Sequence, residues 1–243
     1  MKSIKYNHII KDKELALHTV HKDAYHLEHL SEHFKNNYDI VMTAINNETL
    51  ALQFASNELK NNKEVALKAV SKSGLSLEYV SNELKNDYDI VMAAVQQKYT
   101  SFYYASEELK NNKKIVLVAV NSGHNLKYVS NELKDDYDVV FTAVSTFGLS
   151  LQFISNQMKD NKDIVFAAVL QNKNSLEYAS ERSKNDKELL ELYLNSFNLS
   201  KPSNPSFYME CELKLNILKE QEYLDMNTPK NSHNLQQPKS KKF

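Results

Sequence analysis

One pattern of apolar and polar positions recurs along most of the chain, and LEYVSNELKNDYDIVMAAV at residues 77–95 is a clear copy of it. When the copies are aligned on the residue after each Lys-Asn/Asp-Asn/Asp triplet, units begin at Lys13, Tyr38, Lys63, Tyr88, Lys113, Tyr137, Lys162 and Lys187. The steps are 25 residues, as from Lys13 to Tyr38, apart from one step of 24 residues between Lys113 and Tyr137. A period in this range is the signature of stacked supersecondary units. Because the first residue alternates between Lys and Tyr up to Lys162, a pair of units is the element that was duplicated.

The first ten or so residues of each unit predict a helix. In the unit that begins at Lys63, apolar residues fill 65–67 and 69–70, whereas Glu64 and Lys68 are polar. This spacing predicts a helix that is buried on most of its circumference. The residue before each helix suits an N-cap, since Asn or Asp stands there. These residues are Asn37, Asn62, Asp87, Asn112 and Asp136.

The rest of each unit predicts a second helix of similar length. Leu77, Val80, Ser81 and Leu84 are spaced to share one face of it. Its expected N-caps are Ser76, Ser101, Asn125, Ser150 and Ser175. A serine also recurs within it, at Ser31, Ser56, Ser81, Ser106, Ser130, Ser155 and Ser180. We interpret these serines as small residues of the packed face that bond the carbonyl one turn back, since no His or acid accompanies each of them as a catalytic triad requires.

A unit of this size cannot bury enough apolar surface to fold alone, so its stability must come from its neighbours. The sequence therefore predicts an all-α solenoid of about seven helix-turn-helix units of 24–25 residues with terminal caps. Residues 1–12 are expected to form an N-terminal cap from a worn helix, and residues 13–199 the solenoid. Residues 200–226 are expected to form a linker and an amphipathic C-terminal helix, and residues 227–243 a disordered basic tail.

Composition narrows the classes of function. Three Gly and four Pro leave few places to break a helix. A net charge of −1, with Arg182 as the one arginine, makes nucleic acid an unexpected partner. Cys211 is the one cysteine, which excludes an intramolecular disulfide and fits a reducing compartment. No apolar run is long enough to span a bilayer and the N-terminus has no apolar signal segment, so we expect a cytoplasmic protein or one delivered to a host cytosol.

Units reading DYDIVMAAV, KDIVFAAVLQNKNSLEYASERSKND and SFYYASEELKNN resemble a bacterial tandem-repeat family of unknown function. Units of that family run approximately DKEVVLAAVKQNGxALxYASEELKND, and the similarity covers residues 13–195. The resemblance implies an all-α repeat domain of a kind found in intracellular bacteria, including proposed secreted effectors, and in some protists and large viruses. It implies no activity, cofactor or catalytic residue. The chain departs from the family in its few glycines at the link between helices and in its C-terminal segment.

Histidines gather near the N-terminus, where His26, His29 and His33 are spaced for one helical face and are candidate metal ligands. However, His29 stands at the place of Tyr79 in the repeat and His26 at the place of Ser76. No carboxylate or thiol completes a ligand set. We therefore predict neither a metal nor any other cofactor.

A lysine recurs in the last turn of each predicted second helix, at Lys35, Lys60, Lys85, Lys110, Lys134, Lys159 and Lys184. The helix dipole accounts for these cations. Acidic residues close in sequence, such as Glu83 and Glu108, argue against a phosphate-binding ridge.

Apolar side chains also stand where the repeat holds polar ones. Tyr103 replaces Glu78 and Val118 replaces Lys68, and further apolar residues lie at or beside the links. The predicted partner-binding residues are Tyr99, Tyr103, Val118, Phe147 and Leu170. An exposed aromatic zone of this kind marks a partner site. The alternative is that irregular links fold these side chains back onto the body.

The sequence thus favours a scaffold that binds a protein or peptide, and the family resemblance adds a secreted effector or host-interaction module as its setting. The first alternative is an enzyme whose site involves His18, His21 or the C-terminal segment, although no nucleotide-binding, hydrolase or metalloprotease motif occurs. The second alternative is a structural spacer. Oligomeric state is left open.

Overall fold

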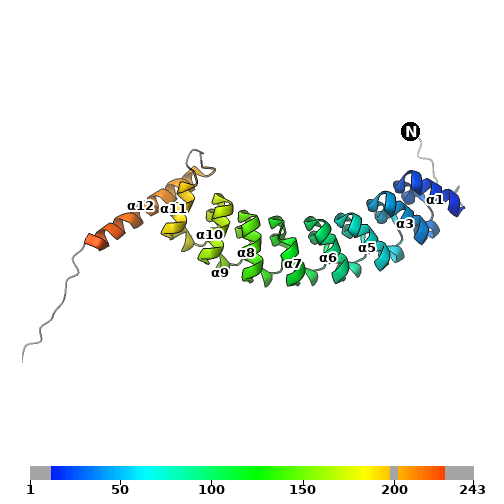
Figure 1. The fold of residues 1–243 in the computed structure, drawn as a ribbon, viewed down its shortest axis with the longest axis horizontal. Helices are drawn as coiled ribbons and strands as arrows, with labels where there is room; N and C mark the ends of the chain where they lie inside the picture. The colour runs from blue at the N-terminus through cyan, green and yellow to red at the C-terminus, as the bar shows by residue number, and fades with distance from the viewer. Residues whose placement is uncertain (1–11, 198–201, 228–243) are drawn as a thin grey trace, which may run out of the picture.

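A computed structural model describes residues 12–197 and 202–227, and every regular element within them is a helix. The units stand side by side in a shallow arc that ends in one long C-terminal helix (Figure 1). This confirms the all-α repeat architecture. The predicted cap at residues 1–12, apart from Asp12, and the predicted tail from residue 228 lie outside the described residues.

Each unit opens with an α-helix. These helices are α1 (Lys13–Lys22), α3 (Tyr38–Asn47), α5 (Lys63–Lys72), α6 (Tyr88–Gln97), α7 (Lys113–Ala119), α8 (Tyr137–Thr146), α10 (Lys162–Gln171) and α11 (Lys187–Asn195). Their predicted N-caps are confirmed: the Asn62 side chain, for example, accepts hydrogen bonds from the backbone N–H groups of Glu64 (3.0 Å) and Val65 (3.1 Å). The unit that is one residue short contains α7, which is the shortest of these helices.

A 3₁₀ helix follows each of the first seven α-helices within the described residues. These are η2 (Ala24–His29), η3 (Thr49–Phe54), η4 (Gly74–Tyr79), η6 (Tyr99–Tyr104), η8 (Gly123–Tyr128), η10 (Gly148–Phe153) and η11 (Lys173–Tyr178). A short helical turn then completes the unit. These turns are α2 (Glu32–Lys35), α4 (Asn57–Lys60), η5 (Leu84–Asn86), η7 (Leu109–Asn111), η9 (Leu133–Asp135), α9 (Asn156–Lys159) and η12 (Ser183–Asn185).

The second half of the unit is therefore not one helix, and this part of the prediction is wrong. The chain is extended at Val80 (φ −69°, ψ 151°), between η4 and η5. Ser76 does not cap a helix but lies inside η4 and is fully buried. In this unit the start of η4 also packs closely on the next one, since a β-carbon on Gly74 would stand 2.3 Å from the carbonyl oxygen of Ala94. A tight 3₁₀ turn with small residues fits that space.

The recurring serines join neighbouring units, which corrects their interpretation as helix-face residues. The hydroxyl of Ser81 accepts from the N–H of Leu84 (3.1 Å) and caps the short turn. It also donates to Oδ1 of Asn61 in the preceding unit (2.5 Å), and the backbone N–H of Ser81 donates to the carbonyl of Lys60 (3.1 Å). The same three bonds are made by Ser56, Ser106, Ser130 and, with an aspartate as acceptor, Ser155 and Ser180.

The asparagine that accepts the serine hydroxyl also donates a hydrogen bond to the next unit. Nδ2 of Asn61 donates to Oε2 of Glu83 in the next unit (2.9 Å), and the pairs Asn36–Glu58, Asn86–Glu108 and Asn111–Glu132 repeat the bond. In the later units the position of Asn61 is held by a carboxylate, as in Asp160, so the side chain that bonds it from the next unit must donate a hydrogen bond. Arg182 does so, with Nη1 lying 3.2 Å from Oδ2 of Asp160. The one arginine of the chain thus has a role at a junction between units.

Charge pairing explains the alternation of Lys and Tyr at the unit starts. Nζ of Lys63 lies 2.8 Å from the carboxylate of Asp87, the next N-cap, and 3.1 Å from that of Asp89. Lys113 and Lys162 pair in the same way with Asp136 and Asp186. Units that start with Tyr38, Tyr88 and Tyr137 are instead followed by the neutral N-caps Asn62, Asn112 and Asn161. Lys63, Lys113 and Lys162 therefore stand where the next cap is charged, whereas Lys13 precedes the neutral cap Asn37 and pairs with Asp39 instead.

This pairing predicts a dependence of stability on pH. Burial alone would raise the pKa of Asp87, but Lys63 and the N–H of Ile90 hold it below its ordinary value. A carboxylate with a lowered folded pKa stabilises the protein above its unfolded pKa of about 3.9, and this contribution is lost as the pH falls. Asp87→Asn is therefore expected to flatten the loss of stability between about pH 5 and pH 3 in urea titrations. Lys63→Gln, which removes the pairing ammonium, should flatten this loss as well, and an unchanged slope in both variants would contradict the pairing.

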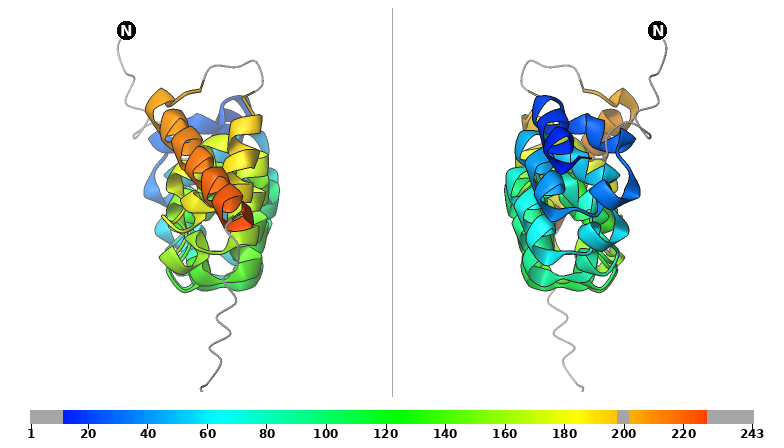
Figure 2. Two further views of the ribbon diagram at one scale, coloured as in Figure 1. Left: turned by 90° about the vertical axis from the view of Figure 1, so that its left-hand side faces the viewer. Right: turned by 90° about the vertical axis from the view of Figure 1, so that its right-hand side faces the viewer.

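The last helix, α12 (Pro205–Asn227), closes the C-terminal end of the stack. Cys211 and Leu215 are buried against α11, whose Tyr193 is fully buried. Seen along the long axis, α12 crosses the end of the solenoid diagonally (Figure 2). Beyond this contact it runs on past the stack (Figure 1), with Tyr223, Leu224 and Met226 exposed.

Candidate binding surfaces

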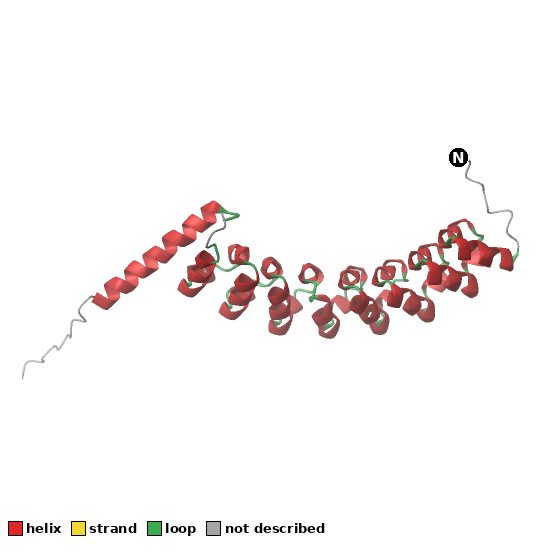
Figure 3. Cartoon of the chain, turned by 45° about the horizontal axis from the view of Figure 1, so that its top comes forward, coloured by secondary structure: helices red, strands yellow, loops and turns green. Residues whose placement is uncertain are grey.

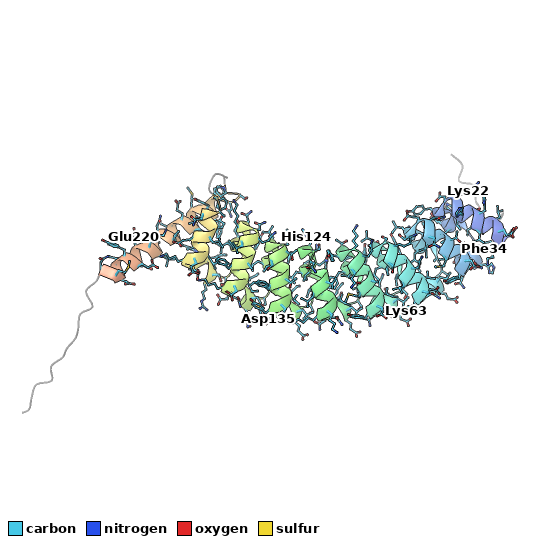
Figure 4. The ribbon with its side chains drawn as sticks, viewed as in Figure 1. Lys22, Phe34, Lys63, His124, Asp135 and Glu220 are labelled. Carbon is cyan, nitrogen blue, oxygen red and sulfur yellow. The ribbon has the colours of Figure 1, made fainter. Side chains whose placement is uncertain are left out.

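The arc has two edges and two faces. The α-helices form one layer and the 3₁₀ helices the other, as contacts between successive α-helices and between successive 3₁₀ helices show (Figure 3). Lys22 and His124, near the links between the layers, lie on the concave edge (Figure 4). Lys63 and Asp135, near the unit starts, lie on the convex edge (Figure 4).

The residues that the sequence marks for partner binding are distributed over these surfaces rather than gathered in one zone. Val118 is half-buried on α7, and Leu170 is 63% exposed near the end of α10. Tyr103 is 52% exposed on η6, in the other layer. Tyr99 and Phe147 lie at links, where the Phe147 ring stacks on His124 with centroids 4.3 Å apart. Phe147 thus folds back onto the body, as the alternative interpretation expects.

The three candidate metal ligands, His26, His29 and His33, each occupy a different structural position in the first unit. Nδ1 of His26 lies 3.2 Å from the carbonyl oxygen of Asp23, within η2. His29 takes the place of an aromatic residue at the end of η2, and the His33 ring lies 5.4 Å from that of Phe34. In residues 12–197 and 202–227, no three His, Cys, Asp or Glu side chains are placed to hold a metal ion.

An apolar column runs along the outer face of the α-layer. The fifth residue of each α-helix is at least partly exposed and is apolar in the first seven: Leu17, Met42, Leu67, Met92, Leu117, Phe141 and Phe166. Leu67, Phe141 and Phe166 are 36–40% exposed, so the predicted burial of Leu67 is wrong. The sixth residue widens the column only in the second half of the stack, where Ala93, Val118 and Ala167 replace polar residues such as Lys68.

We define the α-face patch as the residues on α6, α7, α8 and α10 where this column is widest. They are Met92, Ala93, Leu117, Val118, Phe141, Phe166, Ala167 and Leu170. The Phe141 ring also stacks on Tyr137, with centroids 5.8 Å apart and an interplanar angle of 14°. Helix α10 is apolar from Ile164 to Leu170 on all sides, although one side faces solvent. That composition is unusual for a surface helix and was the signal in the sequence for this patch.

The 3₁₀ layer carries a second surface. Its sixth residue is aromatic in every unit: His29, Phe54, Tyr79, Tyr104, Tyr128, Phe153 and Tyr178. Tyr103 joins this column in the middle of the stack, with its ring centroid 5.1 Å from that of Tyr104 and 5.0 Å from that of Tyr128. The Tyr104 hydroxyl donates to Oε2 of Glu78 (3.0 Å), and burial together with this bond raises the pKa of Tyr104. We call Phe54, Tyr79, Tyr103, Tyr104 and Tyr128 the aromatic ridge.

Comparisons with known proteins identify a family for this chain but do not identify an activity. A family model described as a domain of unknown function, DUF4116, matches residues 12–60, 62–110, 87–134, 112–159 and 136–184. Neither a curated protein nor a solved structure matches the chain. Among the described helices, none has the length and apolar character needed to cross a bilayer.

Proposed function

The chain belongs to the DUF4116 family of domains of unknown function, and we propose that it is a scaffold whose α-face patch binds another protein. The observation that carries this proposal is the apolar surface shared by four successive helices, α6, α7, α8 and α10. Contiguous exposed apolar patches are rare on soluble monomers and mark sites of protein association. The partner would present an apolar surface, such as one side of an amphipathic helix or a folded domain.

The two alternatives account for less of the structure. His18 and His21, on which an enzymatic site would rest, are exposed on α1 at the N-terminal end of the arc. A general acid or base is commonly placed by a partner that orients it and by a cleft that excludes water, and exposed positions on one helix offer neither. A spacer would need only a regular stack. It would not account for the apolar residues Val118 and Ala167 at the position where an earlier unit has Lys68.

The place of action is a further part of this proposal. A reducing compartment suits a chain whose one cysteine, Cys211, is buried and unpaired. We place the scaffold in a cytosol, either that of its own cell or that of a host into which it is delivered as an effector. Support for the second location comes only from the resemblance to families that contain proposed effectors.

The proposal predicts that Phe141→Glu combined with Phe166→Glu abolishes partner capture. Proteins enriched from lysate by the intact chain would be identified by quantitative mass spectrometry, purified, and titrated against each variant by calorimetry. A carboxylate in the centre of an apolar interface is expected to weaken the affinity by about a hundredfold or more. Since both rings are partly exposed, the change in folding free energy should stay within about 1 kcal/mol.

Leu67→Glu provides the matched control. It changes the same repeat position at a similar exposure (38%), but on α5, where Lys68 is polar and the patch is absent. A partner lost with the double variant and retained with Leu67→Glu would support the α-face patch. Equal retention by both variants would refute this surface, and failure of the intact chain to bind any purified candidate would refute the scaffold.

A further inference from the structure

The lysine column lies on the 3₁₀ layer and is half-buried in every unit. It comprises Lys35, Lys60, Lys85, Lys110, Lys134, Lys159 and Lys184. Two of these lysines extend back over the 3₁₀ helix of their own unit. Nζ of Lys110 lies 5.9 Å from the centroid of the Tyr103 ring, and Nζ of Lys134 donates to the carbonyl of Lys127 (3.2 Å). The ammonium groups of Lys110 and Lys134 therefore border the aromatic ridge, and the repeat puts the other lysines at the equivalent place in their units.

Three of these lysines have a carboxylate of their own three residues earlier. Lys35 pairs with Glu32 (3.0 Å), Lys110 with Glu107 (2.8 Å) and Lys184 with Glu181 (3.1 Å). The other four have an asparagine at that place. The four pairs are Asn57 and Lys60, Asn82 and Lys85, Asn131 and Lys134, and Asn156 and Lys159. Across the described part of the chain, no carboxylate oxygen lies within 4.0 Å of these four ammonium groups.

The glutamates that stand next to them in sequence are engaged elsewhere. Glu58 and Glu83 accept hydrogen bonds from the side-chain amides of Asn36 (2.7 Å) and Asn61 (2.9 Å) at the junctions between units. Their carboxylates are held by the scaffold and do not reach the lysine column. The proximity in sequence that argued against an anion-binding ridge is therefore not a pairing in space.

Incomplete solvation makes these cations sensitive to a counter-charge. Burial lowers the pKa of Lys60, an effect that the nearby Lys35 adds to and Glu32 opposes. Burial also lowers the pKa of Lys85, with Glu78 opposing it, and the pKa of Lys134. Removing an ammonium group from water costs free energy that an ion pair can recover. Two pairs of the lysines without a carboxylate partner, Lys60 with Lys85 and Lys134 with Lys159, belong to the units on either side of the one that holds the exposed Tyr103.

We propose that the 3₁₀ layer binds an extended acidic peptide, with carboxylates at Lys60, Lys85, Lys134 and Lys159 and an apolar or aromatic side chain against Tyr103. This surface is separate from the α-face patch, so the proposal goes beyond the scaffold function and does not depend on it. The match is one of charge pattern as well as sign, since the four binding lysines are those with no carboxylate within 4.0 Å among the described residues.

A peptide fits this pattern better than a single-stranded nucleic acid. A phosphodiester backbone carries a negative charge at every nucleotide. It would have to pass Glu78, which accepts the Tyr104 hydroxyl, and the compensated pair of Lys110 and Glu107. A peptide can place neutral residues at these points and carboxylates only where the lysines are uncompensated.

The test uses a fluorescein-labelled random copolymer of Glu and Tyr as the probe, titrated with the full chain by fluorescence anisotropy. Lys60→Gln combined with Lys85→Gln is expected to weaken binding by about tenfold or more, because each change removes an ion pair formed on binding. Lys35→Gln combined with Lys184→Gln removes the same net charge from lysines that have their own glutamates and lie in units remote from Tyr103. It should change the affinity by no more than about twofold. Far-UV circular dichroism checks that both variants remain folded.

Further outcomes decide between explanations. An equal loss in both double variants would mean attraction by overall charge and would overturn the proposal, as would a failure of the copolymer to bind at low salt. Tighter binding of oligo(dT) than of the copolymer, lost with the Lys60 and Lys85 changes, would assign the surface to nucleic acid instead. The Phe141→Glu, Phe166→Glu variant should bind the copolymer as the intact chain does, which keeps this test distinct from that of the α-face patch.

Discussion

Phe102→Ala is expected to lower the free energy of unfolding by about 3–5 kcal/mol. Phe102 is fully buried in η6, in the middle of the stack, and η6 packs against α6 and α7 as well as against η4 and η8. Removing the ring would leave a cavity bordered by the units on both sides. Since each unit of a solenoid is stabilised by its neighbours, the loss would also uncouple the two halves. Urea titration followed by far-UV circular dichroism should show an earlier and broader transition.

Phe102→Leu is the matched control, because six other units hold leucine at this place: Leu27, Leu52, Leu77, Leu126, Leu151 and Leu176. It should cost no more than about 1.5 kcal/mol, as hydrophobic exchanges of similar volume do. A loss as small for Phe102→Ala as for Phe102→Leu would contradict the packing described for the central unit.

Tyr193 is expected to respond in opposite directions to two substitutions. Its ring is fully buried between α11 and α12, edge-on to Phe197 (5.0 Å) and Phe207 (5.4 Å). Its hydroxyl has no hydrogen-bond partner among the described residues, and burial raises the pKa of this phenol. Tyr193→Phe removes an unsatisfied polar group and should stabilise the protein by about 1–2 kcal/mol. Tyr193→Ala should destabilise it by about 3–5 kcal/mol and release α12.

Cys211 provides a direct readout of this junction. It is the one cysteine of the chain, it is fully buried on α12, and burial raises the pKa of its thiol to about 11. Labelling by a disulfide reagent near neutral pH requires exposure of the thiol as its thiolate. Labelling should therefore become faster in Tyr193→Ala and slower in Tyr193→Phe. Destabilisation by Tyr193→Phe would show that the hydroxyl has a partner and would contradict the expected sign.

The candidate surfaces could be predicted only in part, because burial on a repeat depends on which neighbour covers each position. Leu67, Phe141 and Phe166, each the fifth residue of its α-helix, follow the same apolar pattern as the core and are nevertheless exposed. Tyr103 and Val118 stood out by departing from the repeat, but spacing within a unit cannot say that they lie in different layers. Glu107 stands three residues before Lys110, whereas Asn82 stands three residues before Lys85. This difference in charge pairing can be read from the sequence, but it matters only once the structure shows that the lysines are half-buried.

The sequence by itself determined the repeat, the all-α class, the α-helices and their Asn and Asp caps, since each depends on local spacing or on side chains that bond the nearest backbone. Tertiary structure alone decided that the second half of the unit is a 3₁₀ helix and a separate turn. Gly74 and the buried Ser76 lie there in close contact with α6 of the next unit. It also decided that Ser81 joins two units through Asn61 and that the α-face patch is left uncovered. Contacts across a junction involve residues one full unit apart, and periodicity within a unit carries no information about their geometry.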